Sequence, residues 1–549
     1  MSTTFGAIVR RGGAWLPVIG FAALAGTLST LALPAVLGRA VDAIVAGDDS
    51  GRWLVLAAAL VVVGILADLI DASAGIACVA STTAWLRNRL VRQVLRMGPD
   101  RARRFDTGDL VSRISGNAVD AAQAGPAVVT VVAAVLPPAG SLVLLVVIDP
   151  WLAVAFVAGL AVVAAVLRAF TIRSTAVFTA YQRTQGRIAA RLAESLAGAR
   201  TIAAAGTAGR EESRVLEPLP ELHGHGRQTW QVLSRAAAQG AVAGPLVLVA
   251  VLAVGGLALV DGRITAGDLF AASRYAVLGA GLGGLAGVFG QLARARAGAA
   301  RAAEVLTVPA VGHGSRGLPE GTGRLEFRHV TVRSDGTTLL DDVDLTVPGG
   351  ATVAVVGRSG AGKSVLAALA ARLRDPDEGE VRLDGVPLGE LSHAALRTAV
   401  CAAFERPVLV GATVGDAIGP GRDRAELLTA ARATHAHEFV SRYPEGYDTP
   451  LADAPMSGGE AQRLGLARAW HARRLLVLDD ATSSLDMVTE MQISRTLTGD
   501  GGRTRLIVTH RVSTAARADC VVWLDGGRVR AVAPHHRLWQ DAGYREAFG

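Results

Sequence analysis

The sequence predicts an all-α membrane domain followed by an α/β domain. Nearly all long apolar runs lie in the first 305 residues, whereas after residue 323 short β-type runs alternate with helical stretches. The composition agrees, because 51% of the 549 residues are hydrophobic and only 19% are charged, and the mean hydropathy is +0.37. These values are too apolar for a disordered chain and high for a soluble enzyme. Three scattered cysteines exclude a disulfide framework and a zinc site.

Six apolar runs in the first half are each near the roughly 20 residues that a helix needs to cross a bilayer. A spanning segment must satisfy its backbone hydrogen bonds internally, so we expect six helices. The first run could be a signal peptide, but it is long and further runs follow, so we interpret it as a retained helix. The runs cover residues 14–37, 53–67 and beyond, 127–148, 151–170, 242–260 and 268–291.

Arginines predict the orientation of these spans. Two long stretches between spans are rich in arginine, whereas the loops on the other side are short. Because positively charged loops remain in the cytoplasm, we expect both stretches, both termini and the α/β domain on the cytoplasmic side of the cytoplasmic (inner) membrane. The net charge of +7 then requires no nucleic-acid partner. The arginines are Arg87, Arg89, Arg92, Arg96, Arg101, Arg103, Arg104 and Arg113 in the first stretch, and Arg173, Arg183, Arg187, Arg191, Arg200, Arg210, Arg214, Arg227 and Arg235 in the second.

The chain therefore divides into a transmembrane domain (1–305), a glycine-rich linker (306–323) and an α/β domain (324–549). Both arginine-rich stretches lack disorder signals, so we expect the spans to continue as long helices into the cytoplasm; soluble helical hairpins are the alternative. β-type runs are expected at residues 324–332, 352–356, 475–478, 505–508 and 520–524.

The second of these β-type runs leads into a loop of the form G-x-x-x-x-G-K-[ST] and then into an apolar helix. Its glycines let backbone N–H groups turn inward around phosphate oxygens. Lys363 is expected to reach the β- and γ-phosphates, and the Ser364 hydroxyl to hold Mg²⁺. Lys363 is the only lysine among 55 basic residues, and arginine does not replace lysine at a phosphate site. The loop consists of Gly357, Arg358, Ser359, Gly360, Ala361, Gly362, Lys363 and Ser364.

Two later β-type runs end in polar residues. One is followed by Asp479 and Asp480. A carboxylate at a strand end beside a phosphate loop is where Mg²⁺ or its water shell is held, so Asp479 is a candidate metal ligand. Asp480 is the candidate to orient the attacking water, with a helix cap as the alternative. His510 follows another run, where a histidine can sense a γ-phosphate by hydrogen bonding, although a lone histidine is more often structural.

Ser457, Gly458, Gly459 and Glu460 stand at the start of an apolar-periodic helix. Such a helix N-terminus is a second place for an anion. Because the chain already has one phosphate loop, the second site suggests that two nucleotides are shared between two copies of the domain.

Taken together, these motifs resemble the ATP-binding cassette (ABC) transporters, specifically half-transporters of the exporter type, over nearly the whole chain. The resemblance identifies a Walker A loop (357–364), a Walker B strand ending at Asp479, a signature (456–460), a D-loop (483–486) and the switch histidine His510. It implies an α/β P-loop NTPase domain that binds ATP and Mg²⁺. Two such domains would sandwich two ATP molecules, each between one chain's Walker A loop and the other chain's signature, so a partner half-transporter is required.

The resemblance also implies the coupling between ATP and transport. Closure of the two nucleotide domains would pull on the long cytoplasmic helices, whose tips near residues 108–120 and 208–222 would dock on those domains. The spans would then alternate between inward and outward openings.

The chain departs from the family pattern at four places. Asp480 replaces the catalytic glutamate and is one methylene shorter, and a misplacement of about 1 Å can cost on the order of a hundredfold in rate. Glu405 replaces the Q-loop glutamine, although it could still bind nucleotide and Mg²⁺. Glu460 replaces the usual signature glutamine. Ser334 stands where an aromatic ring stacks on adenine, and the nearest upstream aromatic, Phe327, is expected in a strand core.

We therefore expect the chain's own Walker site to bind ATP but to hydrolyse it slowly or not at all. Lys363, Ser364 and Asp479 are intact, and Ser457 with its two glycines could complete a working site on a different chain. This pattern favours one half of a heterodimer; a homodimer that tolerates aspartate is the alternative.

The expected activity is ATP-driven transport, with export favoured, of a small amphipathic, lipid-like or peptide substrate. One alternative is an importer with the exporter fold, for example of a siderophore. Another is a membrane subunit that senses ATP without hydrolysing it. The substrate clues are thin. Asp68 and Asp71 lie three residues apart on one helix face and could meet a cationic substrate, or lie beyond the bilayer or pair with an arginine; Arg274 raises the same question for an anion.

Overall fold

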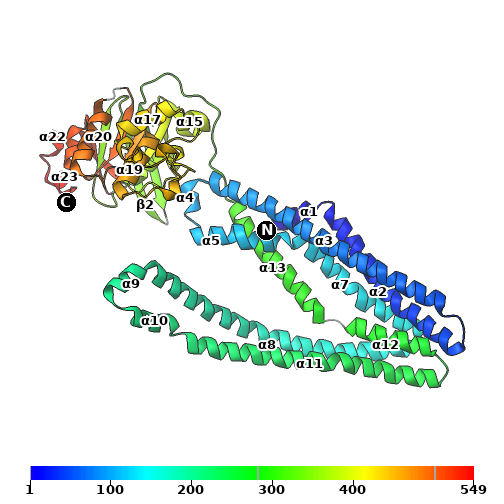
Figure 1. Ribbon diagram of the computed structural model, residues 1–549. Helices are drawn as coiled ribbons and strands as arrows, with labels where there is room; N and C mark the ends of the chain where they lie inside the picture. Colours follow the sequence, from blue (N-terminus) through cyan, green and yellow to red (C-terminus); the bar gives the residue numbers. More distant parts are fainter. Residues whose placement is uncertain (1, 281–282, 335, 500–501, 549) are drawn as a thin grey trace. The chain divides into compact units, whose positions relative to one another are not determined.

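The structure is a computed structural model that describes residues 2–280, 283–334, 336–499 and 502–548. It divides into two compact units, which are described separately (Figure 1). The first comprises residues 1–92 and 106–307, and the second comprises residues 93–105 and 308–549. The short segment 93–105 thus belongs with the α/β part of the chain. The sequence analysis placed it within the transmembrane domain, between the second and third spans.

The first unit is helical, and α3 continues beyond it by four residues, to Arg96. Its helices are α1 (Ser2–Arg11), α2 (Trp15–Ala46), α3 (Gly51–Arg96), α5 (Thr107–Ser112), the π-helical η1 (Arg113–Asn117), α6 (Ala118–Ala122), α7 (Ala124–Ile148), α8 (Pro150–Ala197), α9 (Ala199–Ala205), α10 (Ala208–Leu216), α11 (Leu219–Val260), α12 (Ala266–Ala280) and α13 (Gly283–Leu306).

The predicted apolar runs all fall on these helices. Among the described residues, three helical segments are long and apolar enough to cross a membrane, namely 15–46, 51–96 and 107–148. Two shorter apolar helical stretches correspond to the next two runs. The fourth run begins with residues 150–161 of α8, and the fifth run ends with residues 244–260 of α11. The sixth is divided between α12 and α13, with residues 281–282 outside the described part of the chain.

The intramembrane charges that the sequence singled out lie on α3 (Asp68 and Asp71) and on α12 (Arg274). Among the described residues, neither aspartate forms an ion pair with an arginine. Their role in substrate binding stays a prediction.

Helices α8 and α11 form one long antiparallel pair, joined at one end by α9 and α10 (Figure 1). They contain 48 and 42 residues, about twice the length that a bilayer requires. The prediction of spans that continue as long helices is therefore confirmed here. Ion pairs hold the α9–α10 end together, with 2.8 Å between Arg191 Nη1 and Glu217 Oε2 and 3.0 Å between Arg214 Nη1 and Glu194 Oε2.

Local chemistry explains the sharp turn between α7 and α8. Asp149 has an extended backbone, and its side chain accepts a hydrogen bond from Trp151 N at 2.8 Å. Pro150 occupies the first helical position, where a missing N–H costs nothing. Arg263 Nη1, in the loop before α12, donates to Asp149 Oδ2 at 2.5 Å. Asp149 is thus the whole connection between α7 and α8, which carry the third and fourth apolar runs.

Residues 107–122, which follow the first arginine-rich stretch, are built from α5, η1 and α6. The buried Arg113 side chain in η1 donates to Asp109 Oδ2 at 2.7 Å and to Glu304 Oε2 of α13 at 2.5 Å. This network fixes a π-helical turn, a local geometry that often marks a functional position. Docking of this segment and of residues 208–222 on nucleotide domains stays a prediction.

The second unit contains two sheets. A six-stranded sheet has the order β10-β9-β3-β8-β7-β6, and a four-stranded antiparallel sheet has the order β2-β1-β4-β5. In the larger sheet all neighbours are parallel except β10 and β9. The strands are β1 (Leu325–Ser334), β2 (Thr337–Val347), β3 (Thr352–Val356), β4 (Glu378–Leu383), β5 (Val386–Pro387), β6 (Val400–Phe404), β7 (Leu475–Asp479), β8 (Thr504–Val508), β9 (Cys520–Asp525) and β10 (Arg528–Ala533).

All five predicted β-type runs are strands, with ends within two residues of the prediction. The helices of this unit are α4 (Gly98–Ala102), α14 (Lys363–Ala370), α15 (His393–Ala399), α16 (Val414–Ile418), α17 (Arg424–Ala433), α18 (His437–Val440), α19 (Gly458–Ala469), α20 (Met487–Gly499), α21 (Val512–Arg517), α22 (His535–Leu538) and α23 (Ala542–Glu546), with 3₁₀ turns η2 (Leu388–Glu390), η3 (Gly446–Asp448) and η4 (Leu451–Asp453).

The glycine-rich stretch between α13 and β1 is bound along the second unit rather than free. Gly314 N donates to Gly389 O at 3.0 Å, and Arg316 N donates to Glu390 O at 3.0 Å. A Cβ on Gly314 would lie 1.9 Å from Glu390 O, so only glycine permits this approach. The glycines therefore allow the chain to pack closely as well as to turn.

Candidate functional site

The register of the large sheet brings the predicted site residues to one edge. Phe404 of β6 pairs with Asp479 of β7, which pairs with Val508 of β8, while β8 also pairs with β3. Because these strands are parallel, the residues that follow them meet at the same edge. Glu405, Asp480, His510 and the phosphate loop therefore converge, although they are far apart in the sequence.

The phosphate loop has the strand–loop–helix geometry that its motif predicts. The five residues of β3 are buried, and α14 begins at Lys363. Gly360 and Gly362 adopt φ values of +82° and +97°, which side chains disfavour. A Cβ on Gly362 would also lie 2.6 Å from Leu340 Cδ2. The loop is thus shaped by glycine and turns its backbone N–H groups toward one place.

The Lys363 ammonium lies folded over this loop. Its Nζ donates to Gly357 O at 2.7 Å and to Arg358 O at 2.9 Å. Burial lowers the pKa of Lys363, while the nearby Asp480 and Asp479 carboxylates act in the opposite direction. The cation therefore stands between the loop and the two aspartates, where the predicted β- and γ-phosphate site lies.

Ser364 and Asp479 are in direct contact, with 3.1 Å between Ser364 Oγ and Asp479 Oδ1. Burial raises the pKa of Asp479, and the negative charges of Asp480 and Glu405 raise it further against the Ser364 hydrogen bond. A desolvated cluster of carboxylates beside a hydroxyl is the oxygen-rich donor set that Mg²⁺ prefers. These residues fit a magnesium ion, which would relieve the clustered negative charge.

Asp480 and His510 lie close together in the lining of one cavity. The distance from His510 Nε2 to Asp480 Oδ2 is 3.6 Å. Burial raises the pKa of Asp480, while His510 and Lys363 lower it. Asp480 has a φ of +48°, a strained value for a residue with a side chain. The cavity measures about 290 Å³ and is lined by Glu405, Asp480, Thr482, Ser483, Thr509, His510 and Arg511.

The signature residues form a capping box at the start of α19. Ser457 N and Ser457 Oγ each donate to Glu460 Oε2 at 2.8 Å, and Glu460 N donates to Ser457 Oγ at 3.3 Å. The backbone N–H of Ser457 lowers the pKa of Glu460. Glu460 therefore has a structural role, because its carboxylate accepts hydrogen bonds from groups at the helix start that have no acceptor within the helix. Among the described residues, no hydrogen bond joins Ser457 or Glu460 to the phosphate loop.

Three residues that the sequence analysis did not select connect the site. Gln462 Nε2 donates to Glu405 O at 2.6 Å and to Ser483 Oγ at 3.0 Å. Arg511 donates to Ser483 O at 3.0 Å and forms an ion pair with the buried Glu490. In the sequence, Gln462 could have been noticed because it is a polar residue on the apolar face of α19. Arg511 and Glu490 have no comparable signal in the sequence alone.

Ser334, which stands where the family has a ring that stacks on adenine, lies at the end of β1. Ser334 pairs in register with Thr337 of β2. Phe327 is buried in a hydrophobic core that includes residues of both sheets, so it is a core residue as expected. Neither residue offers a ring to a base.

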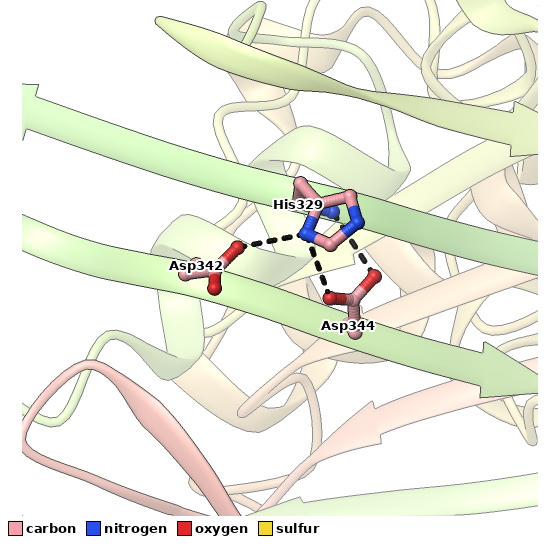
Figure 2. Close-up of side chains that lie close together, drawn as sticks. All are labelled: His329, Asp342 and Asp344. Atoms are coloured by element: carbon pink, nitrogen blue, oxygen red, sulfur yellow. Dashed lines mark hydrogen bonds and ion pairs between the residues drawn. The ribbon is translucent and has the colours of Figure 1, made fainter.

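A separate polar cluster lies on β1 and β2. Figure 2 shows His329 between Asp342 and Asp344, with Nδ1 at 3.0 Å from Asp342 Oδ1 and 3.1 Å from Asp344 Oδ2. The hydrogen bond to Asp342, with the charges of both carboxylates, raises the pKa of His329. His329 and Asp342 both have positive φ values, of 48° and 47°, at irregularities in the β1–β2 register. The exposed cluster fixes this irregular pairing.

Comparison with protein families gives two matches, which together cover most of the chain. Residues 16–278 match the family described as "ABC transporter transmembrane region", and residues 340–483 match the family described as "ABC transporter".

Individual relatives agree with these families. The chain is 48% identical over 532 residues to the ABC transporter ATP-binding protein RamA of Streptomyces coelicolor, covering 96% of this chain and 84% of the relative. It is 34% identical over 445 residues to a fatty acid ABC transporter ATP-binding/permease protein of Mycobacterium bovis, covering 78% and 70% of the two chains. It is 39% identical over 269 residues to an ATP-dependent lipid A-core flippase of Alkalilimnicola ehrlichii, covering 47% and 46%.

Among solved structures, a bacterial Atm1-family ABC exporter with ATP bound superposes with a TM-score of 0.77 at 26% identity. The match covers 99% of this chain and 98% of that chain. The similarity therefore extends over both units.

Proposed function

The chain belongs to the ABC transporters as an exporter-type half-transporter with transport-coupled ATPase activity, and we propose that it is the half of a heterodimer that carries a degenerate ATP site. The heterodimer exports a small amphipathic, lipid-like or peptide substrate across the cytoplasmic membrane by alternating access. Both termini and the ATP-binding domain lie in the cytoplasm.

The observation that carries this proposal is the contrast between the binding groups and the catalytic carboxylate. Lys363, Ser364 and Asp479 are assembled for phosphate and Mg²⁺. Asp480, by contrast, is one methylene shorter than glutamate, and its carboxylate stops 3.6 Å from His510 Nε2, beyond hydrogen-bonding distance. A site that binds well but orients water badly retains affinity and loses rate.

In the assembled transporter each residue has a defined task. Lys363 and the loop N–H groups hold the β- and γ-phosphates. Ser364 and Asp479, with Glu405, would hold Mg²⁺, which would neutralise phosphate charge. His510 senses the γ-phosphate. Ser457, Gly458 and Gly459 meet the ATP held by the partner's Walker loop, where a partner glutamate does the fast hydrolysis.

The substrate class is supported by the relatives. Two of them are named for lipid-like cargo, namely fatty acid and lipid A-core. An amphipathic substrate of this kind can enter from the bilayer into the space between the spans. A peptide with an apolar face has the same physical character.

The composition of the complex tests the heterodimer. The tagged chain would be purified from the membranes of its own host and weighed intact by native mass spectrometry. We expect a mass made of this 56.4 kDa chain and a different half-transporter whose Walker B strand is followed by glutamate. A mass of two identical chains would contradict the proposal.

Transport direction is tested with the purified complex in liposomes whose ATP-binding domains face outward. ATP should drive a fluorescent amphipathic lipid or peptide into the lumen. Release from a preloaded lumen would instead indicate the importer alternative, and ATP binding without any movement or hydrolysis would indicate the ATP-sensing alternative.

A further inference from the structure

A large cavity of the second unit lies beside the phosphate loop, with Val365 in its lining. It measures about 920 Å³, within the about 300–1,000 Å³ of sites for small molecules and cofactors. One wall is formed by the segment between α3 and α5, through Met97, Arg101, Arg103 and Arg104. The opposite walls come from β1, β2 and α14, through Ser334, Thr337, Leu339 and Val365.

The position of this cavity matches the nucleoside end of a bound nucleotide. Val365 directly follows Ser364 on α14. The Cβ position of Gly362, in the phosphate loop, lies 2.8 Å from Leu339 O. A nucleotide whose phosphates occupy the loop can therefore place its sugar and base in this cavity. Ser334, at the place of the missing aromatic ring, is part of the lining.

Arginines replace aromatic rings in this lining. Among the described lining residues none is aromatic, and five are arginines: Arg101, Arg103, Arg104, Arg333 and Arg374. A guanidinium is planar and permanently charged, and it stacks on ring faces while donating hydrogen bonds at its edge. Such a group can take the role of an aromatic side chain against a base.

Three of the five arginines are already engaged. Arg101 Nη1 donates to Pro309 O at 2.7 Å, Arg333 pairs with Glu378 at 2.6 Å, and Arg374 pairs with Asp100 at 3.4 Å. Arg103 and Arg104 are exposed, and within the described part of the chain no hydrogen bond or ion pair engages their side chains. They are therefore the two available guanidinium groups.

The segment that carries them is anchored to the same unit as the phosphate loop. Met97 is fully buried. Val311 N donates to Arg96 O at 2.9 Å, and Arg374 Nη1 holds Asp100. The two arginines are thus presented to the cavity by a fixed backbone rather than by a free loop.

We propose that Arg103 and Arg104 hold the base of the nucleotide bound at the Walker loop, in place of the aromatic ring that Ser334 lacks. This inference rests on the proposed function of that loop as an ATP site. Helix α3 begins in an apolar span at Gly51 and ends at Arg96, seven residues before Arg103. Base binding therefore links the nucleotide site to the end of a membrane helix of the same chain.

The test is equilibrium binding to the full chain in lipid nanodiscs, with ATP and with inorganic tripolyphosphate as probes. Tripolyphosphate lacks a base and reports the phosphate loop alone. The double variant Arg103→Lys/Arg104→Lys keeps both charges and removes the planar forks. Because lysine keeps the charge but has no planar group to stack on a base, we expect this variant to weaken ATP binding about tenfold and to leave tripolyphosphate binding unchanged.

Two further variants sharpen the result. Adding Ser334→Tyr to the double variant should restore ATP affinity, because the ring takes over the stacking. Arg183→Lys/Arg200→Lys, on exposed positions of the first unit, is the matched control and should bind both probes like the unaltered chain.

Unchanged ATP affinity in the Arg103→Lys/Arg104→Lys variant would overturn the inference, as would a parallel loss of both probes. These results differ from a failure of the proposed function, in which the unaltered chain itself would not bind ATP.

Discussion

Asp480→Glu is the substitution that probes the degenerate site most closely. In the structure Asp480 Oδ2 lies 3.6 Å from His510 Nε2, roughly 0.5 Å beyond the upper end of a normal hydrogen bond. Glutamate adds one carbon–carbon bond of about 1.5 Å, which is longer than this gap. A correction of about 1 Å corresponds to about a hundredfold in rate, or about 2.7 kcal/mol of activation free energy.

The assay is Mg²⁺-dependent phosphate release from ATP by the chain in nanodiscs that contain two copies. Lys363→Ala supplies the blank. We expect Asp480→Glu to raise turnover by up to about a hundredfold, and Asp480→Asn, which keeps the length but not the charge, to stay at the blank. If Asp480→Glu bound ATP normally and turned over no faster than the unaltered chain, side-chain length would not limit the rate and the reasoning would be refuted.

Three other predictions follow from the site and from the His329 cluster. Ser364→Ala removes a hydroxyl ligand, so the Mg²⁺ concentration needed for half-maximal ATP binding should rise about tenfold, as measured by Mg²⁺ titration. Gly362→Ala introduces strain of about 1–3 kcal/mol and a clash, so the melting temperature and ATP affinity should both fall. Asp342 raises the pKa of His329, so the Asp342–His329 pair stabilises the folded chain most at low pH. This stabilisation is fully present below about pH 6.5, the pKa of an unfolded histidine, and is lost as the pH rises through the raised pKa. The melting temperature of Asp342→Asn should therefore be lower than that of the unaltered chain at low pH and converge with it at high pH; a constant difference would contradict this.

The elements that the sequence predicted well are those whose pattern is local. The strand 352–356 is a continuous apolar run that leads into a phosphate-loop motif, and Asp479 ends a similar run, so both could be placed without knowledge of their neighbours. The length of α8 and α11 was predictable because their apolar runs continue into arginine-rich helical stretches. The break at Asp149-Pro150 between two apolar runs was equally visible.

What the sequence could not supply depends on contacts between distant segments. The segment 93–105 belongs with the second unit only because residues such as Val311 and Arg374 hold it there. Gln462 links β6 to the D-loop through backbone and side-chain groups that no spacing rule brings together. Glu460 looked like a departure from the signature, but the structure gives it a capping role at α19.

The central claim, that this chain's own Walker site binds ATP but does not turn it over efficiently, is tested most directly on the unaltered chain alone. The measurement is ATP occupancy together with the Mg²⁺-dependent ATPase rate in lipid nanodiscs, with Lys363→Ala as the blank. We expect bound ATP and a rate close to the blank. Robust turnover above the blank would mean that two copies form a working transporter in which Asp480 catalyses, and it would contradict the account.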